Sequence, residues 1–250
     1  MASHKALSFT ADIAEVMLRN GAETYRVEET IHFVLKALTG NEGESFVSPT
    51  SVICTKKEGD ELTTVVRRIR KRTVNFEKVD RANDLSRRLT AGKVSLEGAV
   101  AELEAINNKN NHSYWGSVLT AAVCCGFFVF IFGGVWQDGI AAGITGFFLY
   151  MLREGIGKLE LSNFMSDIIG GAMVAFMASV LVSLGIGQEV RVIIVSAIML
   201  LVPGVALTNA FRDILEGDYL AGMSRLAEAL FVAVCIALGV GMVLRLGIIA

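Results

Sequence analysis

The chain has 250 residues, of which 53% are hydrophobic, and its formal net charge at pH 7 is −2. This apolar fraction is high for a soluble protein, and the near-neutral charge gives no indication of nucleic-acid binding. Charge is unevenly placed, because residues 1–115 hold 33 of the 48 charged side chains and residues 116–250 hold 15. The composition therefore predicts a charged region followed by a membrane region.

Helix and strand patterns alternate in the first part of the chain. Apolar side chains recur at helical spacing over 8–20 and 24–38, with Gly21 between the two segments. Two stretches rich in Val, Ile and Thr follow, ESFVSPTSVICTKK (44–57) and ELTTVVRRIRK (61–71). They predict two or three antiparallel strands.

Two further helices are predicted over 78–90 and 95–107, the second starting at Ser95, a residue type that caps helices. We therefore expect residues 1–112 to form a small cytoplasmic α+β domain, joined to the membrane region by the polar run NNKNNHS (107–113). The basic stretch RRIRK (67–71) is expected to be a solvated strand face, with binding to anionic lipid headgroups as the alternative.

No catalytic or metal-binding motif is found. The sequence has no phosphate-binding Gly-Lys-Ser/Thr loop, no Gly-x-Ser-x-Gly and no His-Glu-x-x-His, and His4, His32 and His112 are isolated. The four cysteines show neither a disulfide framework nor zinc spacing. We expect no cofactor, no metal and no enzyme activity, so transport by this chain would use a gradient rather than ATP.

Five apolar stretches are candidates for membrane spans, since a helix that crosses a bilayer needs about 20 mostly apolar residues. They are 116–136, 138–152, 165–187, 190–210 and 226–248. Residues 113–250 are therefore predicted to form a bundle of about five transmembrane helices.

Lys and Arg in the short loops predict the orientation of these spans. The loop after the second span carries Arg153 and Lys158, and the loop after the fourth carries Arg212 and Arg225. Such residues are enriched on the cytoplasmic side. The N-terminus is therefore expected in the cytoplasm and the C-terminus outside.

Small residues at steps of four predict the faces on which these helices pack. The sets are Gly171, Ala175, Ser179 and Ser183 on the third span, Ala229, Ala233, Ala237 and Gly241 on the fifth, and the pairs Gly139/Gly143 and Ala142/Gly146 on the second. The alternative is the general tolerance of membrane helices for Gly and Ala.

The stretch VPGVALTNAFRDILEGD (202–218) places a helix-weakening Pro203 and then amide, guanidinium and carboxylate groups at the end of an apolar run. One interpretation is a broken helix beside the polar wall of a substrate cavity, with Gly204, Thr208 and Arg212 on one stripe. The alternative is a proline kink with ordinary interfacial charges, in which Arg212 pairs with Glu216.

Asp167, four residues after Asn163, is a second candidate. It is either an acid favoured by the helix dipole near an N-terminus or a carboxylate, linked to protons or substrate, that faces the bundle interior.

Three stretches together resemble the threonine/serine exporter (ThrE) family: RNGAETYRVEETI (19–31), PTSVICT (49–55) and VPGVALTNAFRDILEGDYLAGMSRLAEAL (202–230). The resemblance covers nearly the whole chain. It implies a multi-pass protein of the bacterial inner membrane that exports small polar metabolites, driven by the proton gradient. Typical members export threonine and serine, and two-subunit relatives are linked to dicarboxylates such as succinate.

Fused members of the family continue into a second group of spans, whereas this sequence ends at Ala250. The resemblance thus implies the larger subunit of a split system, which works as an oligomer with a smaller membrane subunit. The expected partners are this subunit, the lipid bilayer and a small-molecule substrate, but no nucleic acid.

The resemblance also supplies candidate site residues. The resemblance implies a cytoplasmic motif of Gly21, Arg26 and Glu28, and a second set of Pro203, Gly204, Asn209, Arg212, Asp213, Gly217, Asp218, Gly222 and Arg225. Together with Asn163, Asp167 and Thr208 from the residue pattern, Pro203, Gly204, Asn209, Arg212, Asp213, Asp218 and Arg225 form the proposed substrate and proton pathway. A substrate carboxylate needs a cation, here Arg212 or Arg225. An amino group or a proton needs a carboxylate, here Asp213 or Asp218. Alternatively, Gly21, Arg26 and Glu28 only stabilise the cytoplasmic domain, with Arg26 bound to a neighbouring acid.

Three other functions remain open at this point. They are a channel, a ligand-sensing membrane protein, and a membrane-anchored hydrolase that uses the cytoplasmic domain.

Overall fold

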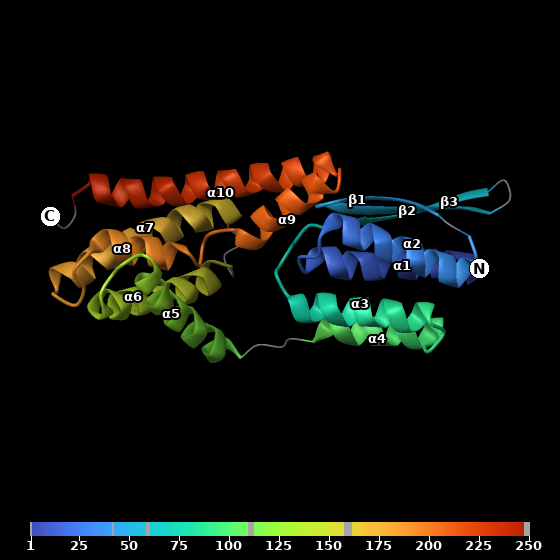
Figure 1. Ribbon diagram of the computed structural model, residues 1–250, viewed down its shortest axis with the longest axis horizontal. Helices are drawn as coiled ribbons and strands as arrows, with labels where there is room; N and C mark the ends of the chain where they lie inside the picture. The colour runs from blue at the N-terminus through green and yellow to red at the C-terminus, as the bar shows by residue number, and fades with distance from the viewer. Residues whose placement is uncertain (1, 42, 59–60, 110–112, 158–161, 248–250) are drawn as a thin grey trace. The chain divides into compact units, whose positions relative to one another are not determined.

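The computed structural model describes residues 2–41, 43–58, 61–109, 113–157 and 162–247 (Figure 1). The chain divides into two compact units. The first unit comprises Met1–Asn110 and Gly204–Ala227, and the second comprises Asn111–Pro203 and Glu228–Ala250. This division differs from the predicted boundary at residue 112, because the segment after Pro203 packs with the N-terminal elements. The assignment of each part to cytoplasm or membrane stays a prediction.

The first unit contains both the predicted helices and the predicted strands. Its elements are α1 (Ala2–Arg19), α2 (Thr24–Thr39), β1 (Glu44–Ser48), β2 (Ser51–Glu58), β3 (Glu61–Arg68), α3 (Phe76–Thr90), α4 (Leu96–Asn108), α9 (Gly204–Leu215) and the first part of α10 (Tyr219–Arg245). As predicted, α4 starts after Ser95, whose hydroxyl accepts a hydrogen bond from the Gly98 N–H at 3.2 Å.

The three strands form one antiparallel sheet in the order β1-β2-β3. Alternation along the strands buries Val47, Val52, Cys54 and Val65 on one face, where they join the core formed with α1 and α2. The prediction of two or three antiparallel strands is therefore confirmed.

The second unit consists of helices only, among the residues that the structure describes. They are α5 (Tyr114–Ile131), α6 (Trp136–Gly157), α7 (Asn163–Ser183), α8 (Val190–Ile198) and the remainder of α10. Within the described ranges, three helices are long and apolar enough to cross a membrane: α5, α7 and α10. The 22-residue α6 carries Asp138, Arg153 and Glu154, and α8 has nine residues, so the figure of five spans stays a prediction.

The predicted fourth span, 190–210, is not one continuous helix. The helix α8 ends at Ile198, residues 199–203 are not helical, and α9 starts at Gly204. Pro203 has no N–H to donate, and its ring disfavours helical geometry at Val202. Of the two interpretations of Pro203, the structure has a broken helix rather than a kinked one, and the break divides the stretch between the two units.

Close backbone packing in the second unit depends on glycines. A Cβ added to Gly171 of α7 would lie 2.6 Å from the Ile236 carbonyl oxygen of α10, and one added to Gly239 would overlap the Ile168 carbonyl. Of the predicted small-residue face of α7, Gly171 and Ala175 are buried, whereas Ser183 is exposed. Of the predicted face of α10, Ala229 is buried, but Ala233, Ala237 and Gly241 are exposed. The glycine of α10 that approaches α7 lies on another face of the helix.

Candidate functional site

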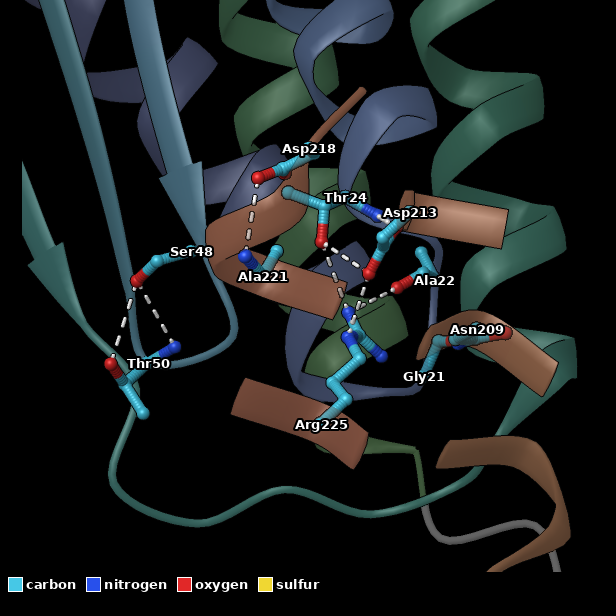
Figure 2. A network of polar contacts seen from close by, with 10 residues as sticks. All are labelled: Gly21, Ala22, Thr24, Ser48, Thr50, Asn209, Asp213, Asp218, Ala221 and Arg225. Carbon is cyan, nitrogen blue, oxygen red and sulfur yellow. Dashed lines mark hydrogen bonds and ion pairs between the residues drawn. The ribbon is translucent and has the colours of Figure 1, made fainter. Parts of the chain in front are cut away.

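The loop between α1 and α2 is where two stretches far apart in the sequence meet. Side chains from α9 and from the start of α10 form hydrogen bonds and ion pairs with residues 21–24. Figure 2 shows those that involve Gly21, Ala22 and Thr24. All of these residues belong to the first unit. The resemblance had singled out both stretches, but their contact could not be seen in the sequence.

Asp213 caps α2 from a position 189 residues away. Thr24, the first residue of α2, donates to the Asp213 carboxylate through its N–H and its hydroxyl, both at 3.1 Å. Glu23 occupies the local N-cap position but makes no side-chain cap hydrogen bond. Because the first N–H groups of a helix lack helical acceptors and carry partial positive charge, a carboxylate is favoured at this point.

Arg225 is the cation that accompanies this carboxylate. Its Nε lies 3.1 Å from Asp213 Oδ2, and its Nη2 donates to the Ala22 carbonyl at 3.2 Å and the Thr24 hydroxyl at 3.3 Å. Both charged side chains are buried, Asp213 completely. A buried pair of this kind is costly to break, because removal of one partner leaves the other charged and out of water.

Burial also changes the acidity of the carboxylates in this cluster. It raises the pKa of Asp213, although Arg225 and the two Thr24 hydrogen bonds oppose the change, and the negative charge of Asp218 adds to it. Burial likewise raises the pKa of Glu28, against the hydrogen bond from Val47 N–H, with Asp218 and Asp213 adding repulsion. The negative charge of Asp218 thus adds to the rise in pKa of both Asp213 and Glu28.

Asn209 and Arg212, which precede Asp213 in α9, contact the same loop. The Asn209 amide donates to the Gly21 carbonyl at 2.9 Å, and Gly21 has φ 102°, a left-handed conformation that favours glycine. Arg212 pairs with Glu23, which also lies 3.5 Å from Arg26. The alternative in which Arg212 pairs with Glu216 is therefore wrong, whereas the alternative in which Arg26 binds a neighbouring acid is confirmed.

The remaining predicted residues of the first unit make local contacts. Glu28 accepts from Val47 N–H at 3.0 Å and so ties α2 to β1. Asp218 accepts from Ala221 N–H at 3.2 Å at the start of α10, and Thr208 donates to the Gly204 carbonyl within α9. The stretch 49–55 forms the turn after β1 and much of β2.

Asn163 and Asp167 lie in the second unit. Asn163 is the first residue of α7, which is capped by the Ser162 hydroxyl. Asp167 is buried and lies 3.5 Å from Arg153 of α6. The predicted site residues therefore form two groups, one in each unit. Pro203 is the last residue of the second unit before the chain enters α9 of the first unit.

Four residues of these networks were not predicted. Glu23 and Thr24 lie inside the first resembling stretch, and only their position between two predicted helices could have marked them. Arg153 was interpreted as a loop charge alone. Asp138 accepts from the N–H groups of Gln188 and Glu189 at 2.6 and 2.9 Å and so fixes the start of α8. In the described part of the chain, no three His, Cys, Asp or Glu residues are grouped to hold a metal ion.

Comparison with known proteins gives a family. The family profile described as "Putative threonine/serine exporter" matches residues 8–247. A "Probable threonine/serine exporter" of Mycobacterium tuberculosis is 25% identical over 97% of this chain and 46% of its own length. The "Threonine/serine exporter" of Corynebacterium glutamicum is 28% identical over 69% of this chain and 36% of its own length.

A shorter relative matches over most of both chains. The "Probable succinate transporter subunit YjjP" of Klebsiella aerogenes is 23% identical over 92% of this chain and 89% of its own length. The chain therefore spans less than half the length of the two exporters but nearly all of the transporter subunit. No solved structure matches the chain significantly.

Proposed function

Since the chain belongs to the threonine/serine exporter family, we propose that it is a subunit of a gradient-driven membrane exporter of small polar metabolites. The family is one of transporters rather than enzymes, which sets the hydrolase alternative aside. The proposed substrates are threonine and serine, named for two relatives, or a dicarboxylate such as succinate, named for a third. The proposed location is the bacterial inner membrane, with the N-terminus in the cytoplasm and the C-terminus outside.

A smaller membrane subunit is the proposed partner, and several copies of the complex are proposed to assemble. The word "subunit" in the name of the Klebsiella relative supports a partner. The apolar helices α5, α7 and α10 support a membrane location.

The buried cluster around Asp213 is the observation that carries the proposed coupling to protons. Its carboxylate joins the segment that follows the helix break to the N-terminus of α2. Burial raises the pKa of Asp213, although the charged carboxylate is attracted to Arg225 and to the positive end of α2. The closed contact between α9 and the α1–α2 loop therefore binds a proton more tightly than an opened contact would, and loss of the proton would favour opening, which is the kind of two-state contact that a coupled transporter needs.

The test is export from proteoliposomes loaded with threonine, serine or succinate, containing this chain alone or with its partner. We expect saturable export that an uncoupler abolishes. Asp213→Asn should lose the dependence on the proton gradient, while Glu216→Gln, which changes an exposed carboxylate three residues further on, should retain it. Absence of flux for every substrate, with both subunits present, would refute the exporter proposal.

One observation favours ligand sensing as a second candidate function. A groove of about 1020 Å³ lies between α1 and α4, with Phe9, Val16, Leu96 and Val100 among its apolar residues and charged residues beside them. Titration of the intact protein with threonine, serine or succinate tests this function. Binding that Val100→Trp abolishes, without any flux in the liposome assay, would favour the sensor.

A further inference from the structure

Three elements of the second unit bring polar groups together at the helix break. Arg153 comes from α6, Asp167 from α7, and the Leu200 carbonyl from the non-helical segment after α8. Arg153 Nη2 lies 3.5 Å from Asp167 Oδ1, and Arg153 Nη1 lies 3.5 Å from the Leu200 oxygen. Cationic, anionic and carbonyl groups thus meet at one point.

Apolar packing fixes this meeting point. A Cβ added to Gly170 would lie 3.3 Å from Leu201 Cδ2 and 3.5 Å from Leu149 Cδ1. Gly170 is about one turn from Asp167, Leu149 is one turn before Arg153, and Leu201 follows Leu200. The polar groups therefore sit on backbone that is held in place by direct contacts between the same three elements.

The break places the Leu200 carbonyl outside a helix, where it accepts from Arg153. The last carbonyls of an α-helix have no helical donor, and they carry the negative end of the helix dipole. Pro203 cannot supply a donor to the carbonyl four residues before it. One turn before Leu200, the buried Ser196 hydroxyl has no hydrogen-bond partner among the described residues. The Ala197 and Ile198 carbonyls accept hydrogen bonds from N–H groups of residues 199–202, whereas the Leu200 carbonyl faces Arg153 and the Ser196 hydroxyl can accept from a cation.

The guanidinium of Arg153 is held loosely. Its two contacts are at 3.5 Å, whereas strong hydrogen bonds between charged groups are about 2.7–2.9 Å. The Arg153 side chain is 42% exposed, although that of Asp167 is 4% exposed. By contrast, Arg225 is buried against Asp213, and Arg212 pairs with Glu23. Arg153 thus has N–H donors left for a carboxylate.

We propose that Arg153 binds the carboxylate of the transported substrate, while Asp167 and the Leu200 carbonyl bind its ammonium group. The inference rests on the proposed exporter function and assigns its substrate site. An α-amino acid satisfies both halves of this site, because its carboxylate and ammonium are attached to one carbon. A dicarboxylate would gain from Arg153 but would be repelled by Asp167. The site therefore selects α-amino acids over succinate.

Binding of radiolabelled threonine to the full chain, purified with its partner, tests this site. In the wild-type protein, threonine should compete at least about tenfold better than threoninamide, which lacks the carboxylate, and than 3-hydroxybutyrate, which lacks the ammonium group. Arg153→Gln should abolish only the preference for threonine over threoninamide. Asp167→Asn should abolish only the preference for threonine over 3-hydroxybutyrate. Arg191→Gln changes another arginine of the second unit and should alter neither.

The possible failures are distinguishable. If the wild-type protein transports none of threonine, serine and succinate, the exporter proposal itself is refuted, whereas transport of succinate without binding of threonine refutes only the site. If it transports threonine but Arg153→Gln keeps full discrimination against threoninamide, only the site is refuted. Because Arg153→Gln could misfold, the wild-type profile decides independently: equal binding of threonine and threoninamide, or preference for succinate, overturns the proposed site.

Discussion

Replacement of Asp213 by alanine should release the start of α2 and destabilise the first unit. The carboxylate is completely buried, accepts two hydrogen bonds from Thr24, and pairs with Arg225 at 3.1 Å. Removal of one partner of a buried ion pair costs about 3–5 kcal/mol. We expect the lower end, about 3 kcal/mol, because Arg225 keeps its contacts with Ala22 and Thr24.

Amide hydrogen exchange measures this effect where it arises, since the Thr24 N–H itself donates to Asp213. A loss of about 3 kcal/mol should speed exchange in peptides covering 22–28 by about a hundredfold, if exchange follows opening of this unit. Glu216→Ala, which removes an exposed carboxylate of the same segment, should leave the exchange rate unchanged.

A double variant separates the ion pair from general damage. Asp213→Leu with Arg225→Met removes both charges, so it should be more stable than Asp213→Leu alone, which leaves a cation in the core. Unchanged Thr24 exchange in Asp213→Ala, or a double variant that shows the simple sum of the two single losses, would refute the proposed role of the pair.

The pKa of Asp213 and of Glu28 is raised by burial, so the folded state binds protons more tightly than the unfolded state, and these groups favour folding at low pH. Their contribution is lost as pH rises through the folded-state pKa values. Between about pH 4 and about pH 7, the free energy of unfolding in detergent should fall less for Asp213→Asn than for the wild-type protein. Gly239→Ala should destabilise the packing of α7 on α10 by about 1–3 kcal/mol, because the added Cβ would overlap the Ile168 carbonyl. Gly241→Ala places its Cβ in open space and should leave the free energy of unfolding in detergent unchanged. Asp138→Ala leaves the N–H groups of Gln188 and Glu189 unpaired, so it should lower the free energy of unfolding by about 1–3 kcal/mol and speed amide exchange at the start of α8. Unchanged exchange there would contradict this role of Asp138.

Local pattern was sufficient for much of the fold. The helices and strands of residues 2–108 follow from apolar periodicity and turn residues, and the break before α9 follows from Pro203, because these signals act over a few residues. The sequence also identified, through resemblance, the two stretches that form the cluster around Asp213.

Contacts across the chain were decided only by tertiary structure. Periodicity could not reveal that Asp213 caps a helix 189 residues away, because an N-cap is normally supplied by the residue next to the helix, here Glu23. It assigned small residues to the wrong face of α10, since small residues lie on several faces and only the partner helix selects one. Arg153 likewise became a candidate site residue only when folding placed it beside Asp167 and the broken end of α8.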